Sequence, residues 1–201
     1  AATPISNQLF TFNGNLASAL LVSFTLDSAV TSANGVDFQM TNGPGAFPYF
    51  GLVQGRDSTN SVMQDGSFNY LYLSTTNQTA ANATPQTVGN GYSTATGFSR
   101  TSESAVWALD LLTDSLAPIW TNPDGGAVVV DLFTQSNALY AGGDQAQFNA
   151  RFPAPVAAYT MSLNIVSRQV GTDPNELPEP GSLALVGLSF CALALARRRK
   201  A

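Results

Sequence analysis

The chain has 201 residues, a formal net charge of −5 and only 10% charged residues, and it contains one cysteine and no histidine. Its first 176 residues carry 12 acidic residues against four arginines and no lysine, which argues against a nucleic-acid binder because affinity for phosphate chains comes mainly from lysine and arginine. The single cysteine, Cys191, lies in the C-terminal tail, so the body has no disulfide, no thiolate nucleophile and no common zinc site.

Between residues 8 and 165, short apolar segments alternate with turn signals, as the strands of antiparallel sheets do. The segments predicted as strands are residues 8–13, 16–27, 36–41, 48–54, 68–73, 106–112, 116–120, 127–134, 138–141 and 157–165. Asn13-Gly14 and Thr113-Asp114-Ser115 are expected to form hairpin turns, and Asn34-Gly35 is expected to form a turn that begins a strand. Residues 74–96 are predicted as a long polar loop, and residues 144–151 as a short helical turn.

An aromatic row at strand spacing is formed by Phe68, Tyr70 and Tyr72. Such rows pack in a core or stack on sugar rings, and we expect these three side chains to be mostly buried. In the alternative interpretation the chain is a carbohydrate-binding module, and Tyr70 and Tyr72 are its candidate glycan contacts, with Tyr49 and Tyr92 as further candidates. That alternative requires at least two of these rings in one open row.

Acidic residues are the remaining candidates for chemistry. The densest group comprises Asp110, Asp114, Asp124 and Asp131. A glycosidase needs two carboxylates facing one another across a cleft, and nothing in this spacing indicates convergence, so a secreted glycoside-acting enzyme is a remote alternative and we expect no enzyme. No cofactor is expected either, although residues 57–60 and 122–125 offer oxygen ligands of the kind that a structural calcium ion prefers.

The tail is organised differently from the body. Pro178-Glu179-Pro180 is followed by an uncharged run over residues 181–196 and then by Arg197, Arg198, Arg199 and Lys200. As a helix the run would span roughly 24 Å, somewhat less than a bilayer core. The four cations predict a cytoplasmic end by the positive-inside rule, which places the body on the far side of the membrane. A buried core helix is the other interpretation, and the same four cations disfavour it.

A proline motif, an apolar helix and a basic end, in this order, resemble the PEP-CTERM sorting signal. The resemblance implies export in a Gram-negative bacterium and recognition by a membrane transpeptidase of the exosortase type. It also implies cleavage near Pro178-Glu179-Pro180 and an association with exopolysaccharide and biofilm matrix.

The expected protein is therefore all-β. An antiparallel β-sandwich of jelly-roll or Greek-key type is predicted over residues 1–170, a linker with the Pro-Glu-Pro motif over residues 171–180, and a transmembrane helix with a basic sorting tail over residues 181–201. The expected function is that of an exported, non-catalytic structural or matrix protein, first anchored in the membrane and finally located at the cell surface or in the extracellular matrix. Its expected partners are an exosortase, the membrane and exopolysaccharide, and no nucleic acid.

Overall fold

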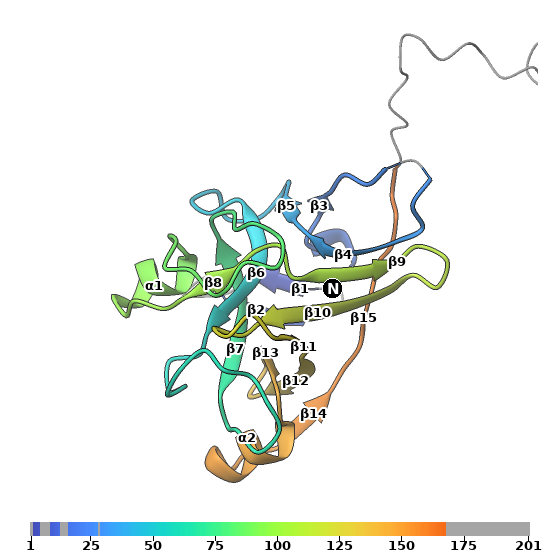
Figure 1. Ribbon diagram of the computed structural model, residues 1–201. Coiled ribbons are helices and arrows are strands. Elements are labelled where there is room, and N and C mark those ends of the chain that lie inside the picture. The colour runs from blue at the N-terminus through green and yellow to red at the C-terminus, as the bar shows by residue number, and fades with distance from the viewer. Residues whose placement is uncertain (1, 5–8, 13–15, 28, 168–201) are drawn as a thin grey trace, which may run out of the picture. The chain divides into compact units, whose positions relative to one another are not determined.

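A computed structural model describes residues 2–4, 9–12, 16–27 and 29–167 (Figure 1). One compact unit comprises Ala1–Asn164, and a second begins at Ile165. The described chain is mostly β-structure with antiparallel pairings, which confirms the all-β expectation. Its helical segments are short: a 3-10 turn over Leu16–Ser18, helix α1 over Gly91–Thr96 and helix α2 over Gln145–Arg151.

The larger sheet has eight strands, and its longest pairing joins β6 to β7. The order across the sheet is β14 (Val156–Ala158), β12 (Asp131–Gln135), β13 (Ala138–Gly142), β7 (Tyr70–Thr76), β6 (Tyr49–Gln54), β5 (Phe38–Met40) and β3 (Val22–Ser23), with β8 (Ser102–Glu103) paired to β6. Many of these neighbours are also close in sequence, as in a meander. The jelly-roll or Greek-key order stays a prediction.

A smaller sheet of five strands lies against the larger one. Its order is β11 (Ala127–Val129), β10 (Ser115–Thr121), β9 (Trp107–Asp110) and β4 (Ser32–Val36), with β15 (Met161–Ser162) paired to β10. The predicted hairpin around Thr113-Asp114-Ser115 is confirmed by the pairing of β9 with β10. A separate two-stranded sheet pairs β1 (Ala2–Pro4) with β2 (Phe10–Phe12).

The centre of the larger sheet is buried on both faces because its central strands alternate between two different apolar clusters. On β7, Leu71 and Leu73 join the cluster between the two sheets, while Tyr70 and Tyr72 join a second cluster on the opposite face. Helix α1 contributes Tyr92 to that second cluster. Helix α2 contributes Phe148. The sheet therefore has the second sheet on one face and two short helices on the other.

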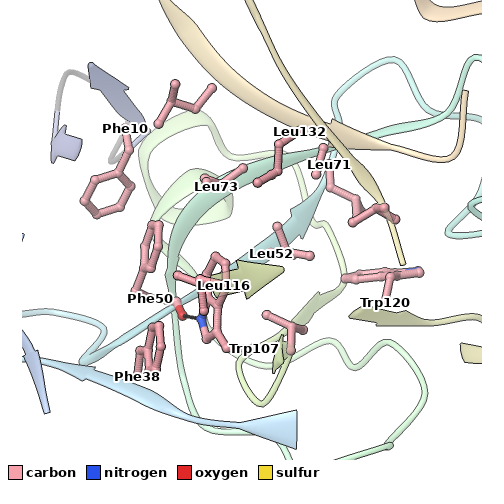
Figure 2. Close-up of a cluster of buried hydrophobic side chains, with 14 of the residues drawn as sticks. Phe10, Phe38, Phe50, Leu52, Leu71, Leu73, Trp107, Leu116, Trp120 and Leu132 are labelled. Atoms are coloured by element: carbon pink, nitrogen blue, oxygen red, sulfur yellow. Dashed lines mark hydrogen bonds between the residues drawn. The ribbon is translucent and has the colours of Figure 1, made fainter. Parts of the chain in front are cut away.

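The centre of the core between the sheets is a stack of three aromatic rings (Figure 2). The indole of Trp107 stacks on the rings of both Phe38 and Phe50, which are opposite one another on β5 and β6, with centroid separations of 5.3 and 4.9 Å. Its Nε1–H donates to the carbonyl oxygen of Phe50 at 2.7 Å. Because Trp107 belongs to the smaller sheet and both phenylalanines belong to the larger one, this stack holds the two sheets together.

Two predictions for the N-terminal third are wrong. The strand β2 pairs with β1 and the strand β3 pairs with β5, so the two predicted strands around Asn13-Gly14 do not form a hairpin with one another. Asn34-Gly35 does not begin a strand but interrupts one. The register of β4 on β9 shifts between Ala33 and Val36, which places one extra residue on β4 as a β-bulge.

The predicted loop and the last predicted strand are also corrected. Within residues 74–96, β7 continues to Thr76 and α1 occupies Gly91–Thr96. The segment 157–165 is not one strand: β14 pairs with β12 in the larger sheet, and β15 pairs with β10 in the smaller one. The helical turn at residues 144–151 is confirmed, and Asp144 caps it by accepting from the backbone N–H of Gln147.

Among the residues that the structure describes, no helix is both long and apolar enough to cross a membrane. The predicted transmembrane helix within residues 181–201 lies outside the described residues.

Candidate functional site

The sequence-predicted sorting residues cannot be placed in the fold. Pro178, Glu179 and Pro180 lie outside the described residues, as do Arg197, Arg198, Arg199 and Lys200. The candidate glycan contacts, by contrast, lie within the larger sheet.

Tyr70 and Tyr72 are buried, with exposed fractions of 4% and 7%. This confirms the expected burial of these two rings, while Phe68 is only half-buried. The hydroxyl of Tyr70 lies 3.1 Å from that of Tyr72 and donates to Asp57 Oδ2 at 3.3 Å. Burial raises the pKa of Tyr70 to about 12. A sugar ring needs an open aromatic face, and neither tyrosine presents one.

Two of the aspartates considered for glycoside chemistry, Asp114 and Asp124, lie at opposite ends of one strand. Asp114 precedes β10 with φ at +54°, and Asp124 follows β10 in the next turn. The seven residues of β10 separate them by about 23 Å, which is much more than the carboxylate spacing of a glycosidase. Asp110 accepts from the backbone N–H of Leu112, and Asp124 accepts from that of Gly126. These bonds are ordinary turn chemistry.

The two segments considered for calcium, residues 57–60 and 122–125, also use side-chain oxygens for contacts within the protein. Asn122 Oδ1 accepts from the backbone N–H of Met63, and its Nδ2 donates back to the carbonyl of Met63. Asp57 forms an ion pair with Arg56 at 3.1 Å, and this partner holds the pKa of the Asp57 carboxyl below its usual value. Within the described ranges, no three His, Cys, Asp or Glu side chains gather as a metal site would require.

A surface groove of about 600 Å³ lies near strands β3, β4 and β5, and we call it the Asp37 groove. Its polar lining includes Ser23, Asp27, Asp37, Gln39, Tyr49 and Gln78. Strand register explains part of this arrangement: Gln39 is directly opposite Ser23 on β3 and opposite Tyr49 on β6. The three side chains thus form a row across three neighbouring strands of the larger sheet.

Asp37 occupies the point where the chain crosses from the smaller sheet to the larger one. Val36 ends β4 and Phe38 begins β5, and both are buried in the core between the sheets. Next to the crossing, Gly35 has φ at +67°, and a Cβ there would lie 2.8 Å from the Cβ of Ala81. Glycine is therefore favoured both by the backbone conformation and by the close approach of Ala81.

The carboxylate of Asp37 is oriented by a residue from the distant polar segment. Gln78 Nε2 donates to Asp37 Oδ2 at 2.8 Å. In the described part of the chain no group donates to Asp37 Oδ1, which is enclosed. A smaller depression of about 420 Å³ lies beside the groove and shares Gly35, Asp37 and Gln78 with it. Asp37 therefore stands at the junction of the two depressions, with its Oδ2 bonded to Gln78 and its Oδ1 enclosed without a donor among the described residues.

Sequence reasoning did not identify this groove. It placed Asp37 and Gln39 in the predicted strand over residues 36–41, whereas Asp37 lies between β4 and β5, and it placed Gln78 in the predicted loop, so nothing brought the three residues together. The signal that could have indicated the site is Asn34-Gly35. A glycine that follows a polar residue inside an alternating strand often marks a β-bulge, and β-bulges are frequent beside binding sites.

Glu103 is a second unusual carboxyl group. It is 3% exposed, and its Oε2 accepts from the backbone N–H of Thr121 at 3.1 Å. Burial raises its pKa to about 8. Strongly shifted carboxyls often mark active sites, but Glu103 lines neither depression. It joins β8 of the larger sheet to the end of β10 in the smaller one, which is a structural position.

Comparison with known proteins concerns the tail alone. A family model described as the PEP-CTERM protein-sorting motif matches residues 176–200. Neither the comparison with curated proteins nor that with solved structures gave a match. The matched range contains Pro178-Glu179-Pro180 and Arg197 to Lys200, which confirms the resemblance seen in the sequence, and the motif is one that a membrane exosortase recognises in exported proteins. The chain therefore carries a PEP-CTERM protein-sorting motif over residues 176–200, C-terminal to the all-β body.

Proposed function

We propose that the β-rich body is the non-catalytic part of an exported protein that is delivered to the cell surface or the extracellular matrix. The observation that carries this proposal is the sorting motif at residues 176–200. In the proposed route, residues 181–196 cross the inner membrane as an apolar helix with Arg197 to Lys200 on the cytoplasmic side. Transfer or release then occurs near Pro178-Glu179-Pro180.

The low content of charged residues in the body supports contact with uncharged polymers. Charged residues make up only 10% of the chain, and within residues 2–167 the sole cations are Arg56, Arg100 and Arg151. Of these, Arg56 is paired with Asp57, and Arg151 lies over the ring of Phe152. The remaining polar surface is largely hydroxyl and amide groups, which bind neutral hydroxyl-rich chains by hydrogen bonds without any counterion.

The arrangement of acidic side chains supports a non-catalytic body. A hydrolase of glycosides would need a close pair of carboxylates in a cleft, and Asp114 and Asp124 are far apart in two exposed turns. Glu103, whose pKa suits an acid at neutral pH, is enclosed between strands away from the Asp37 groove.

Replacement of all four tail cations, Arg197 to Lys200, by alanine tests the route in the native host. We expect the wild-type chain in the surface or extracellular fraction and the alanine variant in the inner-membrane fraction, because the positive charges orient the helix for the sorting enzyme. Fractionation with quantitative immunodetection measures the distribution.

A charge-preserving variant is the matched control. Changing Arg197, Arg198 and Arg199 to lysine keeps four cations and should leave sorting close to wild type, because orientation depends on charge. If the alanine variant and the wild type distribute identically, the proposed route through the tail is wrong.

A further inference from the structure

We propose that the Asp37 groove binds an uncharged, hydroxyl-rich ligand, namely a short segment of a neutral polysaccharide. This extends the proposed function by giving the exported body a specific binding site. The groove lies within the described residues of the body and is independent of the tail.

The charge of the groove selects against anions. Its charged lining residues are Asp27 and Asp37, and no Arg, Lys or Glu contributes to the lining. A phosphate, a sulfate or a uronic acid would approach two negative charges with no cation to compensate them, which is unfavourable in a concave site. A neutral ligand that donates hydrogen bonds meets no such penalty.

The row across the sheet has the mixture of groups that a sugar requires. Ser23 and Gln39 offer a hydroxyl and an amide, and the half-buried ring of Tyr49 lies at the end of the row. With strands about 4.8 Å apart, the row is about 10 Å long. Amide and hydroxyl groups bind the hydroxyls of a sugar, while its C–H face packs on an aromatic ring.

Asp37 adds a carboxylate acceptor beside this row. Its carboxylate receives one hydrogen bond from the described chain, from the exposed side chain of Gln78, and no donor in the described residues reaches its Oδ1. A ligand hydroxyl that displaces the Gln78 amide would form a charge-assisted hydrogen bond with this carboxylate. The displaced Gln78 side chain would still lie between the groove and the smaller depression, because it lines both.

The size of the groove fits a small ligand better than a bare cation. Its volume of about 600 Å³ falls in the range of ligand pockets in general. Calcium would need six to eight oxygen ligands at short distance, and among the residues with described positions no cluster of three acidic side chains exists to supply them.

The test is a titration of the purified full chain, kept in a detergent without a sugar headgroup so that the detergent cannot compete. The probes are a panel of neutral gluco-, manno- and galacto-oligosaccharides, a matched panel of uronic-acid oligosaccharides, and CaCl₂ alone. We expect binding of at least one neutral oligosaccharide, and we expect Asp37→Asn and Tyr49→Ala each to weaken it by about tenfold or more, because each removes one principal contact.

The control variant is Asp65→Asn, which removes an exposed aspartate that does not line the groove and should leave the affinity unchanged. Thermal unfolding verifies that each variant is folded. The proposal is overturned if no neutral oligosaccharide binds at about 10 mM, if only the uronic acids or calcium bind, or if both groove variants bind as the wild type does. Such a result would leave the export route intact, because that is measured by fractionation in the native host.

Discussion

Replacing Trp107 with alanine should lower the free energy of unfolding by about 4 kcal/mol, the largest loss of stability that we expect from any substitution in the core. The indole is fully buried and stacks on Phe38 and Phe50, so its removal leaves a large cavity where the two sheets meet. It also leaves the carbonyl of Phe50 without the indole N–H. Chemical denaturation followed by circular dichroism measures the change.

Two further variants separate the causes. Trp107→Phe keeps an aromatic ring but removes the N–H donor, so it should cost less, about 2 kcal/mol. Val129→Ala, on the exposed edge strand β11, should change stability by no more than about 0.5 kcal/mol. If Trp107→Ala is as mild as Val129→Ala, the aromatic stack is not what joins the sheets.

Replacing Glu103 with glutamine should remove a dependence of stability on pH. Burial raises the folded-state pKa of Glu103 to about 8, above its ordinary value of 4.5. Both states hold the proton below pH 4.5, so the stabilisation from this group is complete there. It is lost as pH rises from 4.5 to about 8, because the unfolded chain releases the proton and the folded chain retains it.

Glutamine imitates the protonated acid at every pH. The amide oxygen of the glutamine accepts from the Thr121 N–H, as Oε2 of Glu103 does. Its amide nitrogen takes the place of Glu103 Oε1, which has no hydrogen-bond partner among the described residues. We therefore expect the variant and the wild type to be similarly stable at pH 4.5, with the variant more stable at pH 9 by on the order of 5 kcal/mol.

Denaturation of both proteins from pH 4.5 to 9 measures this difference, in which the contributions of all other titrating groups cancel. Asp65→Asn, a surface carboxyl replaced in the same way, should show no comparable gain at pH 9. Parallel stability curves for Glu103→Gln and the wild type would mean that Glu103 is ionised in the folded protein, and the structural role assigned to it would then be incorrect.

Local pattern predicted much of the fold because strand alternation is a local property. The hairpin at Thr113-Asp114-Ser115 and the burial of Tyr70 and Tyr72 followed from residue spacing and turn chemistry. That Leu71 is equally buried did not, because it depends on the smaller sheet covering the face of Leu71 while α1 and α2 cover the opposite face, which carries Tyr70 and Tyr72. Period-2 alternation does not reveal whether the second face is covered.

The sequence predicted where strands occur better than it predicted which strands pair with one another. Segment 157–165 has uninterrupted alternation, yet β14 and β15 pair in different sheets, and only the distant partners β12 and β10 determine where the chain crosses. Asn34-Gly35 was similarly misjudged, because a turn and a β-bulge both favour glycine with a positive φ.

The sorting tail and the Asp37 groove also differ in how far local sequence predicts them. The sorting tail was recognisable because its proline motif, apolar run and basic end are contiguous over residues 176–200. The Asp37 groove was not, because its central hydrogen bond joins Asp37 to Gln78 across 41 positions of the sequence. No local pattern records such a contact.

The most direct test of the proposed sorting is the intact mass of the protein recovered from the surface or extracellular fraction of its native host. We expect a mature species that lacks Arg197 to Lys200 and ends within or next to Pro178-Glu179-Pro180, with the mass of any attached polymer in addition. A mature species at the surface that still ends at Ala201 would contradict it.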